Sequence, residues 1–129
     1  MPAPTAATYS AAAKVAAHTS FRDLLDSGAS AGSAKIRTSA DALLATIPLS
    51  DPCGTVNGTT GQLTLTFPAP ADATASGEAA YAELCDSDGD VHLALPCQAG
   101  SAAVSGKFVL NTLSIISGSP VEVISATIG

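Results

Sequence analysis

Apolar residues between positions 10 and 27 recur with the period of an α-helix and form one stripe. Gly28 follows this segment, and a glycine at the C′ position ends a helix without strain because it adopts positive φ freely. The pattern therefore predicts one helix near the start of the chain. The residues of its apolar stripe are Ala13, Ala17, Phe21, Leu24 and Leu25.

This stripe allows two arrangements. The helix can cover the open face of its own domain, or it can reach across to another subunit together with the residues before it. We therefore take Phe21, Leu24 and Leu25 as candidates for a partner interface. Residues 1–12 contain two prolines and mostly small side chains, which predicts an N-terminal arm that is flexible or ordered by a partner.

From residue 34 onward the period falls to two, as in strands that bury one face. Short strands punctuated by Gly, Pro, Asp and Ser are typical of a sandwich or a jelly roll. We predict a mostly β fold, a jelly-roll-like β-sandwich with one N-terminal α-helix, in which residues 13–129 form a single domain without an internal repeat. The predicted strands are 34–38, 42–49, 62–67, 78–85, 91–95, 107–110 and 121–128, with 112–116 a short strand or an extended connection.

The composition favours other proteins as partners. Hydrophobic residues make up 47% of the chain, but many of them are alanine, and aromatic residues make up only 4%. Charged residues make up 12%, well below the roughly 25% of ordinary soluble domains. Covering such a surface desolvates few ions, which suits close packing between proteins. The net charge is −6 and the five basic residues are scattered, so we predict no nucleic-acid binding.

No run of the sequence approaches the ~20 apolar residues that a membrane span needs, so no membrane partner is predicted. The alanine-rich N-terminus lacks a basic n-region, and Lys14 and His18 interrupt it, which is unlike a signal peptide. Cys53, Cys85 and Cys97 leave at least one thiol unpaired, which fits reduced cysteines in a cytosol, with a single disulfide as the alternative.

The densest polar cluster is the segment Cys85-Asp86-Ser87-Asp88-Gly89-Asp90. Asp86, Asp88 and Asp90 could hold a cation weakly, but the segment does not match the glycine and glutamate positions of an EF-hand loop. The preferred interpretation is a β-hairpin in which Asp88-Gly89 forms a type I′ turn between two alternating strands.

No catalytic constellation is recognised. Cys85, His92 and Cys97 match no zinc spacing and lack a fourth ligand, so the two cysteines are interpreted as small core residues. His18 and His92 belong to no nucleophile motif. We therefore predict no enzymatic activity, no catalytic residues, no metal and no cofactor.

Several segments, in this order, resemble a family of small proteins encoded among the head genes of tailed phages and prophages. They are also similar to the jelly-roll cement proteins that decorate phage capsids. The resemblance covers residues 13–128. It departs from the family at Thr38-Ser39-Ala40, where the family often has an aromatic residue or a threonine, and at Tyr81-Ala82, where the family often has a pair of aromatic residues and this chain has only Tyr81. The segments that carry it are 28–37, 43–52, 77–89 and 111–123.

The resemblance implies a structural virion protein, a capsid decoration or cement protein that binds and stabilises the major capsid protein shell of a tailed bacteriophage. Its partners would be the major capsid protein and further copies of itself, as a dimer or trimer. It would be made in the cytoplasm of the bacterial host and lie on the capsid exterior of the virion. The alternative is a phage tail or fibre component with a receptor- or carbohydrate-binding β-sandwich, although such sites usually need aromatic platforms, which are scarce here.

Overall fold

The computed structural model describes residues 9–128, and this part of the chain begins with helix α1 (Ala11–Leu25). Ser10 caps the helix, because its side-chain oxygen accepts a hydrogen bond from the N–H of Ala13 at 3.1 Å. Gly28 follows the helix with a φ of +103°. The helix predicted for residues 10–27 is therefore present and ends two residues earlier. Residues 1–8 of the predicted arm lie outside the described residues, and residues 11 and 12 belong to α1.

The predicted apolar stripe is wrong at Ala13, Ala17 and Leu24, which are exposed. The covered side of α1 runs instead through His18 to the fully buried Leu25. The ring of His18 is hydrogen-bonded to the backbone carbonyl of Gly61. This polar contact fixes the rotation of the helix, which the spacing of apolar residues alone did not reveal.

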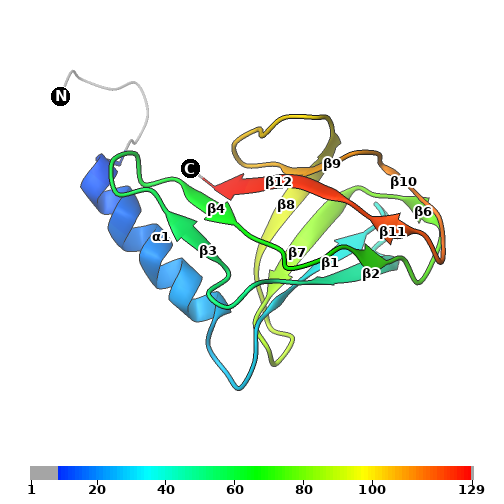
Figure 1. The fold of residues 1–129 in the computed structure, drawn as a ribbon, viewed down its shortest axis with the longest axis horizontal. Helices are drawn as coiled ribbons and strands as arrows, with labels where there is room; N and C mark the ends of the chain where they lie inside the picture. The colour runs from blue at the N-terminus through cyan, green and yellow to red at the C-terminus, as the bar shows by residue number, and fades with distance from the viewer. Residues whose placement is uncertain (1–8, 129) are drawn as a thin grey trace.

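The rest of the described chain consists of short strands (Figure 1). They are β1 (Ser33–Arg37), β2 (Leu43–Pro48), β3 (Gly54–Val56), β4 (Leu63–Leu65), β5 (Ala71–Asp72), β6 (Gly77–Glu78), β7 (Tyr81–Cys85), β8 (Val91–Ala99), β9 (Phe108–Leu110), β10 (Ser114–Ile115), β11 (Pro120–Val121) and β12 (Val123–Ile128). Eight of them form the main sheet in the order β2-β1-β7-β8-β9-β12-β4-β3, and β10 with β6 and β11 with β5 form two small ribbons. The prediction of a mostly β fold with one N-terminal helix is confirmed.

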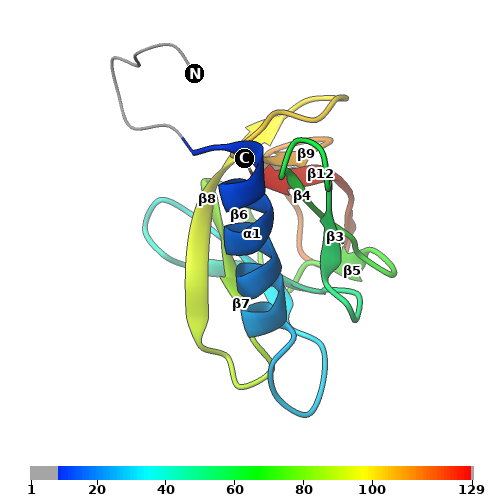
Figure 2. The same ribbon diagram turned by 90° about the vertical axis from the view of Figure 1, so that its left-hand side faces the viewer.

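The main sheet curls, and α1 lies across one of its open ends (Figure 2). In that view β7 and β8 lie on one side of the helix and β3 lies on the other. The side chains enclosed by the curl form one core, in which Phe108 is the largest fully buried residue. Phe67 meets the ring of Phe108 edge-on, with the ring centroids 5.6 Å apart. The arrangement is therefore sandwich-like.

The jelly-roll part of the prediction is not confirmed. Strands β8 and β9 pair in parallel, with Cys97 opposite Phe108. A jelly roll is instead built from antiparallel strands that form two Greek keys.

Two hairpins of the main sheet have the same register. In the first, β1 pairs with β2 and Ser33 lies opposite Pro48; in the second, β7 pairs with β8 and Tyr81 lies opposite Pro96. Each residue of the first hairpin corresponds to the residue 48 positions later, and the register shifts at the equivalent place in both. The prediction that the chain has no internal repeat is therefore wrong for the backbone. The identical residues are Ala34 and Ala82, Ser39 and Ser87, and Pro48 and Pro96.

The loops that close these two hairpins also match. Thr38 and Asp86 open them, and each donates its N–H to the carbonyl group four residues ahead. The side-chain oxygen of each of these two residues accepts N–H groups from two and four residues ahead. Asp41 and Gly89 take the same place in the two loops, with φ angles of 67° and 88°. The loops therefore share one backbone design with different side chains.

A proline stands at the equivalent position in the second strand of each hairpin. The residues that follow Pro48 and Pro96 are Leu49 and Cys97, and each donates its N–H back to the segment that precedes the inner strand. Because successive residues of a strand point their backbone groups to opposite edges, the nitrogens of the two prolines face outward. A proline in this position loses no hydrogen bond of its hairpin. Strand β2 is the end of the main sheet, whereas β8 pairs with β9 from Cys97 onward.

Candidate functional site

The outer face of β2, β1, β7 and β8, the side turned away from the core, is the most distinctive surface of the described chain. In β1, Ala34 and Ile36 are fully buried, while the residues between them point outward. Strands β1 and β7 have their main contacts with their neighbours in the sheet. The face is therefore open, and its central row runs side by side through Thr46, Lys35, Glu83 and Ala94.

Arg37 holds the polar side chains of this outer face together. Its Nε donates to a carboxylate oxygen of Glu83, and its Nη1 donates to the backbone carbonyl of Asp41 at 3.0 Å. The hydroxyl of Tyr81 donates to the carboxylate of Asp41 at 2.6 Å. The four side chains come from β1, from the loop after it and from β7, so they meet only once the sheet has formed.

These contacts hold the charges of the network in place. The hydrogen bond to Glu83 is the main reason that the pKa of Arg37 is raised. The hydrogen bond to Asp41 is likewise the main reason that the pKa of Tyr81 is raised, because a phenolate would face a carboxylate. At neutral pH, Arg37 and Glu83 are therefore paired charges and Tyr81 is a neutral donor. Covering this face with another protein leaves no charge of the pair without a partner.

No local pattern of the sequence predicts the whole network. The charged residues Lys35 and Arg37 alternate with buried residues, and this alternation is a signal that both lie on one open strand face. The partner Glu83 lies 46 residues after Arg37, and only the pairing of β1 with β7 brings the two together.

Asp86, Asp88 and Asp90 lie in the loop between β7 and β8, as predicted, but the turn is not of type I′. Type I′ requires positive φ at both central residues, and Gly89 is the residue of this loop with positive φ. The N–H of Gly89 donates to the carbonyl of Asp86 at 3.1 Å, which makes 86–89 a type I turn with the glycine at its last position. The carboxylate of Asp86 accepts the backbone N–H groups of Asp88 and Asp90 at 3.0 Å. The carboxylate of Asp86 therefore shapes the loop, and Asp88 and Asp90 contribute backbone groups to it.

The structure does not bring the zinc candidates together. Cys85 is fully buried, while His92 is bonded to the carboxylate of Asp86. Burial raises the pKa of the Cys85 thiol, and it raises the pKa of Cys97 to about 12. Within residues 9–128 there is no group of three or more His, Cys, Asp or Glu side chains that could hold a metal ion.

Neither histidine is joined to a nucleophile in the part of the chain that the structure describes. His18 is bonded to the backbone carbonyl of Gly61, and His92 is bonded to Asp86. Each ring therefore has a structural partner, one anchoring the helix and the other anchoring a hairpin loop.

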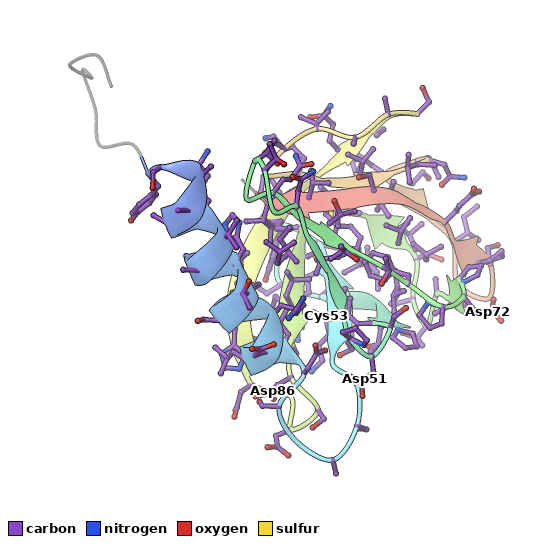
Figure 3. The ribbon with its side chains drawn as sticks, turned by 60° about the vertical axis from the view of Figure 1, so that its left-hand side comes forward. Asp51, Cys53, Asp72 and Asp86 are labelled. Atoms are coloured by element: carbon purple, nitrogen blue, oxygen red, sulfur yellow. The ribbon has the colours of Figure 1, made fainter. Side chains whose placement is uncertain are left out.

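A second feature that the sequence did not reveal is the attachment of the end of α1 to Cys53 (Figure 3). The carboxylate of Asp26 accepts the N–H of Cys53 at 2.9 Å, and the thiol of Cys53 donates to the carbonyl of Arg22 at 3.7 Å. Burial raises the pKa of Asp26, and it is the main cause that raises the pKa of Cys53 to about 12. The contact therefore uses a neutral thiol and an ionisable carboxyl group to hold the helix against the sheet.

The candidate partner residues on α1 require correction. Leu25 is fully buried in the domain's own core, and Phe21 packs against that core. Of the three candidates, Leu24 alone is open to solvent, with 45% of its surface exposed. The helix therefore covers its own domain and leaves one large apolar side chain for a partner.

The surface cavities lack the combination of side chains that catalysis needs. A cavity of about 170 Å³ is lined mainly by the proline-rich segment 67–70. A wider, open hollow of about 610 Å³ lies beside β10, and Glu78 is its single ionisable lining residue, without an aromatic neighbour. Neither hollow combines an acid, a base and a nucleophile.

Comparisons of the chain with protein-family models, with curated proteins and with solved structures found no match. Among residues 9–128, no helix is long and apolar enough to cross a bilayer.

Proposed function

We propose that this protein is a structural virion protein that decorates a capsid and binds the major capsid protein of a tailed bacteriophage. The observation that supports this best is the outer face of β2, β1, β7 and β8. It is open, and the charges of Arg37 and Glu83 are already paired with each other. A partner that covers this face gains contact area, and neither Arg37 nor Glu83 is left buried without its counter-charge.

The remaining support comes from the sequence. Charged residues are only 12% of the chain, and the order of its segments resembles phage head proteins. A shell repeats one binding site many times, so a modest interface in each copy adds up to a large stabilisation of the whole particle. A cement protein of this kind needs no enclosed pocket and no catalytic group.

The direct experiment is co-sedimentation of the purified protein with shells of the phage that encodes it, prepared without this protein. We expect saturable binding at a copy number in the hundreds and a higher temperature of shell disassembly. Shells that bind nothing and come apart at the same temperature would contradict the proposal.

A matched pair of variants tests the outer face. Lys35→Glu places a negative charge beside Glu83 in the centre of the face, and it should weaken binding about tenfold, equivalent to about 1.4 kcal/mol. Lys107→Glu makes the same change in net charge outside the four strands, and it should bind like the wild type. Equal loss in the two variants would indicate long-range charge effects rather than contact.

A second candidate function is receptor or carbohydrate binding in a tail or fibre, and Tyr81 is the observation that favours it. Its ring lies on the outer face among Arg37, Asp41 and Glu83, and an aromatic ring with polar neighbours is the usual carbohydrate platform. Glycan-array binding that is lost in Tyr81→Ala, but kept in Tyr9→Ala at the exposed start of the helix, would support this function instead.

A further inference from the structure

The loop between β3 and β4 begins with Asn57-Gly58, a pair of neighbours that can react with each other. Both residues are exposed. Asparagine is thermolabile, because the backbone nitrogen of the next residue can attack its side-chain carbonyl carbon. Gly58 offers this nitrogen without hindrance, since a Cβ added there would meet no atom within 4 Å. Its N–H also donates to no acceptor among the described residues, so the nitrogen is not held in the loop by a hydrogen bond.

We propose that Asn57 is a site of spontaneous modification in the folded protein, where it converts through a cyclic imide into aspartate and isoaspartate. The nitrogen of Gly58 forms a bond to Cγ of Asn57, the Cγ–Nδ2 bond breaks, and Nδ2 leaves as ammonia with the proton from that nitrogen. One water molecule then opens the imide. Opening at Cγ gives aspartate, and opening at the backbone carbonyl carbon gives isoaspartate, in which the chain runs through the side chain. This inference is independent of the proposed function.

The hydrogen bonds of the loop support the first step. Oδ1 of Asn57 accepts the N–H of Thr59 at 2.8 Å and the N–H of Thr60 at 3.0 Å. These donors hold the carboxamide against the backbone of the loop, next to the nitrogen that attacks it. They also point at the oxygen on which negative charge develops during the attack, and preorganised N–H groups at such an oxygen lower the barrier. The folded loop therefore assists the reaction.

Gly61 connects this site to helix α1. Its N–H donates to the backbone carbonyl of Asn57 at 2.8 Å, and its own carbonyl is hydrogen-bonded to His18. A Cβ added at Gly61 would lie 3.1 Å from the backbone carbonyl carbon of Lys14, so the loop and the helix are in close contact. Isoaspartate adds a methylene to the backbone and turns the carbonyl of residue 57 into a free carboxylate. The loop then loses the bond that positions Gly61, and we expect α1 to be held less firmly.

Incubation of the purified protein in mildly alkaline buffer, followed by peptide mapping with mass spectrometry, tests the site. We expect the peptide with residue 57 to gain the mass difference between an amide and an acid. Asn111 is the internal control, because it is also exposed but precedes Thr112, and it should stay unchanged. Gly58→Ala should slow the conversion at least about tenfold, equivalent to a barrier higher by about 1.4 kcal/mol. Equal rates in Gly58→Ala and the wild type, or equal conversion at Asn57 and Asn111, would overturn the inference.

Urea-unfolded protein separates the effect of the loop from that of the sequence. If the loop assists the attack, Asn57 converts at least as fast in the native protein as in the unfolded protein. Slower conversion in the native protein would show that the fold protects Asn57, and it would overturn the inference.

Thermal unfolding of the converted protein tests the link to α1. The converted protein should have a lower Tm than the unmodified protein. Asn57→Asp adds the same charge but keeps the backbone and a side-chain acceptor, so it should melt like the wild type. In His18→Ala the conversion should lower the Tm by less, because the contact with Gly61 is already absent. Equal Tm values for the converted protein and Asn57→Asp, or an undiminished loss in His18→Ala, would overturn the link.

Discussion

The carboxylate of Asp86 lies 2.9 Å from Nε2 of His92, and the pair spans the loop between β7 and β8. The same carboxylate holds the backbone N–H groups of Asp88 and Asp90. The hydrogen bond from His92 is the main reason that the pKa of Asp86 lies below its ordinary value of 3.8. The shape of this loop is therefore coupled to the ionisation of one side chain.

Asp86→Asn should make the stability of the fold less dependent on pH under acidic conditions. A carboxyl group with a lowered folded-state pKa stabilises the fold above the ordinary pKa, and this contribution is lost as the pH falls through the lower folded value. We expect the Tm of the wild type to fall more steeply than that of Asp86→Asn as the pH drops below about 4. At neutral pH the variant should be the less stable of the two. Circular dichroism melts across this pH range would show the difference.

Asp88→Asn provides the control for this prediction. Asp88 is exposed and contributes its backbone N–H to the loop rather than its carboxylate. Its acid profile should follow that of the wild type. If Asp86→Asn also follows the wild type at every pH, the link between the hydrogen bonds of the Asp86 carboxylate and stability is wrong.

The thiols should be unreactive in the folded protein. Burial is the main cause that raises the pKa of Cys53 and of Cys97 to about 12, and it also raises the pKa of Cys85. Because the thiolate is the nucleophile, very little reactive species is present near pH 8. We expect an aromatic disulfide reagent to modify the native protein far more slowly than the denatured protein. Rapid modification of any one thiol in the native state would contradict the burial described here.

Asp26 offers a test of the contact between the helix and the segment before β3. Burial is the main cause that raises the pKa of Asp26. The protonated carboxyl group therefore stabilises the fold, and this contribution is lost as the pH rises through the folded-state pKa. Asp26→Asn removes the charge and keeps an acceptor for the N–H of Cys53, so it should raise the Tm at neutral pH.

Asp26→Ala separates the hydrogen bond from the charge. This variant leaves the buried N–H of Cys53 without its acceptor, and it should lose about 1–3 kcal/mol in denaturant unfolding. If the alanine variant is as stable as the asparagine variant, the hydrogen bond contributes nothing measurable.

Local pattern predicted most of the elements but few of their contacts. The helix near residues 10–27 and the strands with clear alternation are present, because burial of one face imposes the same period on sequence and structure. Strands β3 and β5 were missed, since Gly54–Val56 and Ala71–Asp72 are too short to show a period. Strand β8 continues to Ala99, beyond the predicted end at residue 95. The nitrogen of Pro96 faces away from β7, so the proline removes no hydrogen bond of that pairing, and β9 pairs with β8 from Cys97 onward.

The repeat and the polar network could not be predicted from the sequence for a different reason. The two hairpins share backbone hydrogen bonds rather than residue types, so Thr38 performs the same task as Asp86, and Asp41 the same as Gly89. A hydroxyl and a carboxylate can both accept the loop N–H groups, which allows the side chains to differ. Contacts such as that of Arg37 with Glu83 depend on which strands become neighbours in the sheet. The period of apolar residues within one segment does not predict the order of the strands.

The core should depend strongly on one aromatic residue. Phe108 is fully buried and meets Phe67 edge-on, whereas Phe67 is only partly buried. Phe108→Ala should cost about 3–5 kcal/mol, as for other large-to-small core substitutions. Phe67→Ala should cost less, because part of that ring already faces solvent. Urea unfolding of both variants measures this difference, and an equal cost would show that Phe108 is not the centre of the core.

The equivalence of Asp41 and Gly89 predicts where a side chain strains the loop. Gly89 has a φ of 88°, and an added Cβ would meet no atom closer than Nζ of Lys35 at 4.0 Å. Gly89→Ala therefore creates no clash, and its expected cost of about 1–2 kcal/mol comes from the left-handed backbone alone. Gly89→Asn should cost less, because asparagine tolerates this conformation as Asp41 does in the matching loop.

Gly58→Ala is the control, since Gly58 has ordinary φ and open space around it, and it should not lower the free energy of unfolding. If Gly89→Ala and Gly89→Asn lose equal stability, the two loops do not share the backbone demand that their hydrogen bonds indicate.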